Sequence, residues 1–85
     1  MDKEIITILK SDDRLKIKAL YNEFRSPFLG FGKGFHLDAD ALSDVYQEVF
    51  LALRKKAIND TLNEVKCSTK TYLFGIGKFM IYDTL

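Results

Sequence analysis

Four residues of mixed acidic, amide and apolar type form the pattern in this 85-residue chain that is best suited to recognising a partner. Between 38 and 57, apolar residues recur at three- and four-residue steps, and helical steps of about 100° per residue place a different group opposite them. That group is Asp44, Gln47, Glu48 and Leu51. Carboxylates and an amide around one leucine offer a protein partner charge complementarity and an apolar anchor. The alternative is an ordinary solvated face with one stray leucine.

Side chains that catalyse reactions or bind metals are scarce. The only histidine is His36, no cysteine lies near it, and no pair of acidic residues is spaced for metal binding or acid–base chemistry. Cys67 is the single cysteine; it has no partner for a disulfide within the chain, and we interpret it as a half-buried small residue rather than a nucleophile. We therefore predict that the protein is not an enzyme and has no metal or cofactor.

The composition favours one small folded domain. Apolar residues make up 47% of the chain and charged residues 29%, with a single proline, which is typical of a globular chain. The net charge is only +1, so any contact with a nucleic acid must be local. No apolar run approaches the ~18 residues that a membrane span needs, and the start of the chain lacks the features of a signal peptide. We expect one domain over 1–85, in the cytoplasm and without membrane contact.

The apolar spacing predicts an all-α fold, a compact bundle of about four helices. After a short first helix, a second begins near Asp13 and is expected to be kinked or broken at Pro27, because proline lacks an N–H and clashes with the preceding turn. A half-helix from Pro27 to about Phe35 follows. Within it Gly30 and Gly34 share one face, which favours tight packing against another helix over a phosphate-binding loop.

Two further helices complete the prediction. The strongest periodicity spans 38–57, with Asp38 or Asp40 as the N-cap. The segment 58–67 shows no sustained period and is predicted to be a loop with at most one helical turn. A serine or threonine at 68–69 then caps a last helix that runs to the end of the chain and is apolar almost all round. Such a helix is central to a fold or presents part of its surface to a partner.

Three segments in order resemble one protein family. The run 44–53 (DVYQEVFLAL) resembles the Asp-Leu-Val-Gln-Glu-Thr-Phe-Leu-x-Leu signature of extracytoplasmic-function sigma factors of bacterial RNA polymerase. The run 19–27 (ALYNEFRSP) looks like the opening Leu-Tyr…Tyr…Pro helix of that family. The run 71–78 (TYLFGIGK), together with Asp83, looks like its helix that touches the promoter's minus-ten element. Each motif alone is loose, but their order and separation make the chain from 15 to 85 similar to the second-region (region 2) domain.

This resemblance implies a domain that acts in transcription initiation. In the family, the signature helix binds the coiled coil of the polymerase β′ subunit, which would assign Asp44, Gln47, Glu48 and Leu51 to polymerase binding. Arg54 and Lys55 either extend that surface or are a solvated helix end. In the same family, the loop before the last helix holds a flipped base from the non-template strand of the promoter minus-ten element, and the last helix contacts the same DNA. The candidate DNA contacts are Asn59, Asn63, Lys66, Lys70, Tyr72 and Lys78.

The sequence departs from the family at Phe79, which stands where an asparagine usually reads a base. Hydrogen-bonded readout is lost there, and Phe79 is expected to pack or to stack. The family's C-terminal helix-turn-helix domain (region 4) is absent from this chain, and an anti-sigma factor is a further partner that the resemblance allows. The alternative is a helical protein-interaction or dimerisation module with no DNA binding, in which the loop is only a solvated connector.

Overall fold

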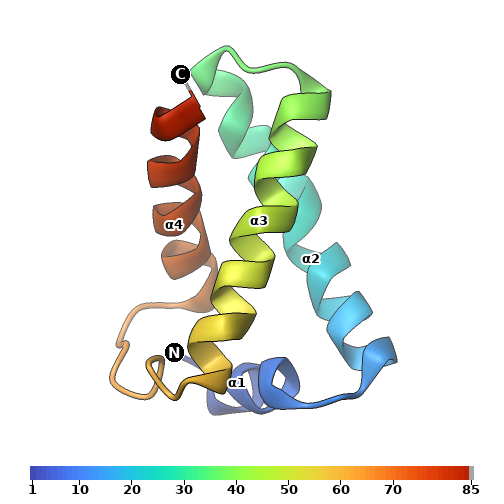
Figure 1. The fold of residues 1–85 in the computed structure, drawn as a ribbon, viewed down its shortest axis with the longest axis vertical. Helices are drawn as coiled ribbons and strands as arrows, with labels where there is room; N and C mark the ends of the chain where they lie inside the picture. The colour runs from blue at the N-terminus through green and yellow to red at the C-terminus, as the bar shows by residue number, and fades with distance from the viewer. Residues whose placement is uncertain (85) are drawn as a thin grey trace.

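The computed structural model describes residues 1–84 and folds them into a small helical bundle (Figure 1). Its elements in chain order are α1 (Lys3–Lys10), α2 (Arg14–Gly32), the 3-10 helix η1 (Lys33–Phe35), α3 (Ala39–Ile58) and α4 (Thr69–Thr84). α3 is central and packs against each of the other α-helices, and α1 lies across the end of the bundle where α3 finishes. The predicted all-α bundle of about four helices is confirmed, while the expected end of the last helix at Leu85 lies outside the described residues.

Polar caps set where the helices begin. Asp38 Oδ1 accepts a hydrogen bond from the Ala41 backbone N–H at 2.7 Å, and Ser68 Oγ accepts one from Thr71 at 3.2 Å. Each cap satisfies one of the N–H groups that the first turn of a helix leaves without a partner. The same role is played at the two earlier helices by Asp2 and Asp13. Of the alternatives that the sequence left open, the caps are therefore Asp38 and Ser68.

Pro27 does not break the second helix. α2 continues through it to Gly32, and η1 carries the chain on to Phe35. The prolyl side chain is exposed, whereas Phe24 and Phe28 on either side of it are buried in the core. Because the missing N–H falls on the solvent side and the flanking aromatic residues hold the helix to its neighbours, packing outweighs the local cost of proline. Of the two alternatives predicted at Pro27, a kink or a break, the break is excluded, and the predicted end near Phe35 was right.

Close approach of the helices occurs at different glycines from those predicted. A Cβ atom placed at Gly30 or Gly34 would meet nothing within 4 Å. At Gly32 a Cβ atom would lie 2.4 Å from Cδ2 of Leu42. The glycine at which α2 closely approaches α3 is therefore Gly32. The expectation of tight packing at Gly30 and Gly34 was wrong because Gly30 of α2 and Gly34 of η1 both face solvent.

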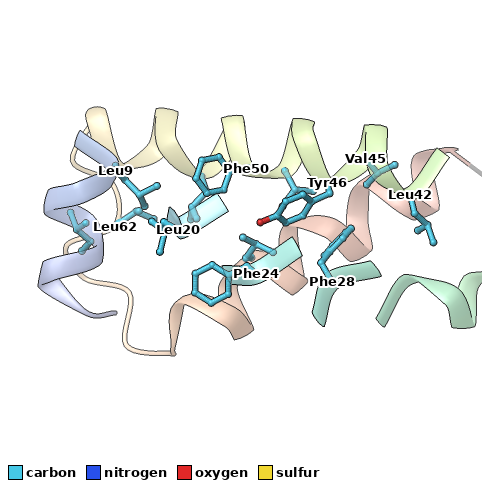
Figure 2. Packing of buried hydrophobic residues seen from close by; sticks show 14 of the residues in the cluster. Leu9, Leu20, Phe24, Phe28, Leu42, Val45, Tyr46, Phe50 and Leu62 are labelled. Carbon is cyan, nitrogen blue, oxygen red and sulfur yellow. The ribbon is translucent and has the colours of Figure 1, made fainter. Parts of the chain in front are cut away.

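Tyr46 lies at the centre of the core (Figure 2). Its ring is fully buried, and the ring centroid lies 4.8 Å from that of Tyr21 and 5.3 Å from that of Phe28. The phenol Oη donates a hydrogen bond to the Tyr21 backbone carbonyl at 2.5 Å. A buried hydroxyl without a partner would be costly, so this bond lets α3 place a polar group between aromatic rings and ties it to α2.

Burial raises the pKa of the Tyr46 phenol, and Tyr21 raises it further, whereas Arg25 opposes them. An unfolded tyrosine ionises near pH ~10, so the folded state holds this proton more tightly. The resulting stability is present below pH ~10 and is lost as the pH rises beyond it. We expect Tyr46→Phe to lower the free energy of unfolding by about 1 kcal/mol at neutral pH, and the gap to wild type to narrow in alkali. Urea unfolding followed by circular dichroism would measure both, and a gap that stays constant contradicts the prediction.

Candidate functional site

The outward side of α3 carries the four residues that the sequence singled out. Asp44, Gln47, Glu48 and Leu51 are all exposed, and Leu51 keeps 64% of its surface accessible. The inward side of the same helix supplies buried core residues, since the apolar stripe faces α1, α2 and α4. None of the four is therefore needed to hold the bundle together. They form one contiguous surface, which we call the α3 outer face.

A groove between the first half of α2 and the middle of α3 adjoins the α3 outer face. It has a volume of about 890 Å³. Ile17 and Tyr21 of α2 and Phe50 of α3 give it apolar walls, and Gln47 and Leu51 line it from the α3 outer face. The sequence analysis missed the contribution of α2. The signal was present, because Ile17 and Tyr21 are four residues apart and so share one side of a helix.

Charge is unevenly distributed around this groove. Asp40, Asp44 and Glu48 are exposed and follow one another at four-residue steps along the first half of α3. Arg14 and Lys18 of α2 line the groove itself. Within residues 1–84 the ion pairs join Lys10 to Asp60 and Arg54 to Asp12, so these three carboxylates of α3 form none. The surface thus has an acidic end and a basic end, which can orient a charged partner.

Arg54 connects the groove to α1. Its Nε atom donates to the Leu9 carbonyl at 3.2 Å and its Nη2 atom to the Ser11 carbonyl at 3.3 Å, while Asp12 Oδ1 lies 3.9 Å away. Carbonyl groups at the end of a helix lack intrahelical hydrogen-bond donors, and the Arg54 guanidinium provides donors for these two. The guanidinium is therefore committed to holding the end of α1. Of the two cations considered for the docking surface, Lys55 is exposed and Arg54 is half-buried.

The loop between α3 and α4 is exposed at its tip and anchored at its centre. Asn59, Asn63 and Lys66 are exposed as expected for contact residues. Leu62 is fully buried, which fixes the loop to the core. The Asn63 side-chain amide donates to the Asp60 carbonyl at 3.4 Å, within the loop itself. These interactions give the loop a defined shape, and a backbone hydrogen bond from Val65 N–H to the Leu62 carbonyl at 3.1 Å closes one turn within it.

A shallow hollow of about 410 Å³ lies where this loop meets α4. Lys66 and Lys70 both line it, so the structure brings together two of the predicted DNA contacts. Thr69 also lines the hollow and is buried; among the described residues its Oγ1 has no hydrogen-bond partner. Cys67, another lining residue, is exposed, so its interpretation as half-buried was wrong.

α4 carries the remaining predicted DNA contacts, Tyr72 and Lys78, and two further exposed aromatic residues, Phe79 and Tyr82. Lys78 is exposed, whereas Tyr72 is half-buried and packs against the core, which leaves it less available. Phe79 and Tyr82 are 75% and 53% exposed, respectively. Phe79 therefore does not pack into the core. Of the two expectations for this residue, packing or stacking, packing is excluded. An almost wholly apolar helix must expose some apolar side chains, so the composition of this helix already indicated exposed aromatic residues such as Phe79 and Tyr82.

Other site types find no support in the described part of the chain. Among residues 1–84, no three side chains of His, Cys, Asp or Glu come together in a group that could bind a metal ion. None of the helices in those residues has the length and apolar character to cross a membrane. Comparison of the chain with protein-family models, with curated proteins and with solved structures found no match.

Proposed function

We propose that this chain is a transcription initiation module similar to the second-region domain of sigma factors, which docks on the β′ coiled coil of bacterial RNA polymerase and engages the promoter minus-ten element. The observation that carries the proposal is the α3 outer face. The residues that match the family's polymerase-binding signature are also those that the bundle leaves exposed beside a groove. A chain that used them only for packing would have buried them.

The groove suits a helical partner in both shape and charge. Its walls are apolar, and Leu51 stands at its edge as an exposed anchor. A coiled coil presents helices with apolar and charged side chains, so it fits apolar walls flanked by charge. Asp44 and Glu48 would meet basic residues of the partner, and Arg14 of α2 would meet acidic ones. This arrangement favours one orientation of the coiled coil over its reverse.

Support for the DNA contact comes from the loop and α4. Lys66 and Lys70 share the hollow before α4, and Lys78 lies two turns further along the helix. Lysines of this kind bind phosphates, while exposed amides such as those of Asn59 and Asn63 bind base edges. The net charge of the chain is close to neutral, so DNA affinity depends on the polymerase to position this local surface.

The competing function is a helical interaction module with no DNA role, because Leu51, Phe79 and Tyr82 could equally contact another protein. Photo-crosslinking separates the two. The full chain is mixed with core polymerase and a single-stranded non-template minus-ten oligonucleotide that carries photoreactive bases. We expect crosslinks to residues between Asn59 and Lys78, because an opened strand would lie along the loop and α4.

The control for this experiment is the same mixture without core polymerase, in which the crosslinks should weaken strongly. Binding to an isolated β′ coiled-coil fragment is measured in parallel. Binding to the fragment without any DNA crosslink would support the interaction module instead. Absence of both would remove the proposal.

A further inference from the structure

The basic side chains of the groove between α2 and α3 gather at one of its ends. Arg14 and Lys18 of α2 line the groove, and both are exposed. They are four residues apart, so they lie on the same side of the helix. Among residues 1–84 the ion pairs involve neither of them. The end of the groove where α2 begins therefore offers a ligand two cations.

Acidic groups around this end do not cancel the two cations. Asp12 also lines the groove, but its Oδ1 atom lies 3.9 Å from Nη2 of Arg54, another lining residue, so these two charges offset each other. Asp13 caps α2, where its side chain accepts from the Lys16 backbone N–H, and it does not line the groove. The formal charge of the lining residues is therefore positive.

The opposite end of the groove does not attract anions. α2 and α3 run antiparallel (Figure 1), so Gln47 lies at the end away from the start of α2. Asp44 and Glu48 stand beside it on the α3 outer face. Arg25 does not line the groove, and its Nη2 atom donates to the Ser43 hydroxyl at 3.4 Å. An anionic group is thus drawn to the end where α2 begins and repelled from the other.

Between its ends the groove is apolar. Its walls there are Ile17, Tyr21, Phe50 and Leu51. On each helix the lining residues cover about two turns, 14–21 of α2 and 47–54 of α3, or about 10 Å along the axis. The volume of about 890 Å³ is in the range of small-molecule sites. An extended aliphatic chain of octyl length fits along such a groove.

One cationic end and an apolar length are complementary to a ligand with one anionic head group and one aliphatic chain. Carboxylates pair with arginine and lysine through charge-assisted hydrogen bonds. The chain is stabilised because its apolar surface leaves water. A partner helix, in contrast, carries charged side chains at intervals along its length. The distribution of charge therefore favours a small amphiphilic carboxylate as a ligand of this groove.

We infer that the groove binds a carboxylate with an aliphatic chain of medium length, with its head group on Arg14 and Lys18 and its chain along Ile17 and Leu51. Gln47 and Leu51 belong both to the groove and to the α3 outer face. An occupied groove would therefore block docking of the β′ coiled coil. This regulatory consequence rests on the proposed function, whereas binding of the carboxylate does not.

The test is a nuclear magnetic resonance titration of the full chain at low ionic strength, where ion pairs are least screened. Octanoate carries the head group and the chain, octanol carries the chain without charge, and acetate carries the charge without the chain. Octanoate should shift the methyl signals of Ile17 and Leu51 and bind about tenfold more tightly than octanol. Acetate should cause no shift at the same concentrations.

Variants of the groove separate the contributions of charge and chain. Arg14→Gln and Lys18→Gln should each weaken octanoate binding by about threefold. The double variant should bind octanoate no more tightly than octanol. Lys16→Gln is the matched control, because Lys16 is exposed on α2 but does not line the groove, and it should leave both affinities unchanged. Ile17→Ala should weaken binding of octanoate and of octanol alike, by about threefold. Circular dichroism checks that each variant keeps its helix content.

Two results would overturn the inference. Equal affinity for octanoate and octanol would show that the cations play no part. A loss of octanoate affinity in Lys16→Gln as large as that in Lys18→Gln would show that the placement of charge does not matter.

The regulatory consequence is measured separately, by anisotropy of the labelled β′ fragment. Octanoate should displace the fragment from wild type and from Lys16→Gln, and the Arg14→Gln/Lys18→Gln variant should need about tenfold more. A fragment that stays bound at saturating octanoate would overturn the competition. A chain that binds octanoate but ignores the fragment loses only the proposed function. A chain that binds the fragment but not octanoate loses only this inference.

Discussion

Glu48→Arg should weaken binding to an isolated β′ coiled-coil fragment by roughly 30-fold or more, because losing a charge pair at an interface costs about 2 kcal/mol at least and reversal adds repulsion. Glu48 lies in the exposed acidic series of α3 and forms no ion pair within residues 1–84. The substitution therefore removes nothing from the folded domain. Gln47→Arg, at the edge of the groove, should have a similar effect. Fluorescence anisotropy with a labelled fragment measures both.

The matched control is Glu64→Arg, which makes the same change of charge at an exposed residue of the loop, away from the groove. It should leave affinity for the fragment within about twofold, since charge on the rim of or beyond an interface contributes little. Helix content should be equal in all three variants. If Glu48→Arg bound like Glu64→Arg, the α3 outer face would not be the polymerase-binding surface, and the proposed function would lose the observation that carries it.

Gly77→Ala should destabilise the domain by about 2 kcal/mol, the net of overpacking near 3 kcal/mol and of a gain near 1 kcal/mol in helix propensity. A Cβ atom at this position would lie 2.2 Å from Cε2 of Phe28. Phe28 is fully buried, and Tyr46 and Phe74 surround its ring at 5.3 and 5.8 Å. The ring cannot move aside, so α4 must. In a domain of this size the midpoint of thermal unfolding should fall by roughly 10 °C.

Gly75→Ala provides the comparison on the same helix. Nothing lies within 4 Å of a Cβ atom there, so this variant should gain up to about 1 kcal/mol from helix propensity alone. A second test uses Phe28→Leu, which removes the ring that the new methyl group meets. The double variant with Gly77→Ala should be more stable than the sum of the two single changes predicts. Equal stability of the Gly75 and Gly77 variants would refute the packing argument.

The helices and the residues that cap them could be predicted because they depend on local patterns. The three- and four-residue spacing over 38–57 gave a helix whose inward and outward sides the structure reproduces. Asp38 and Ser68 could be proposed as caps since each is a short polar residue before an apolar run. The exposure of Asp44 and Glu48 follows from the same geometry.

What could not be predicted depends on contacts between segments. Continuity of α2 at Pro27 is decided by the buried aromatic residues that flank it, and the sequence does not say where they pack. Which glycines allow close approach depends on how each helix is rotated toward its neighbour, so Gly32 and Gly77 could not be distinguished from Gly30 and Gly34. The groove has walls from two helices and has no signature in either alone.

The first helix has a consequence for any shortened form of the protein. α1 has only 8 residues, fewer than a helix needs to persist by itself in water, and it is held by the burial of Ile6 and Leu9 and by Arg54. Leu9 lies near Leu62 at the end of the bundle (Figure 2). A chain that started at α2 would leave Leu62 and the adjoining apolar side chains in water. Such a chain would be expected to aggregate. Removal of α1 should therefore lower the solubility of the protein while most of its helix content remains.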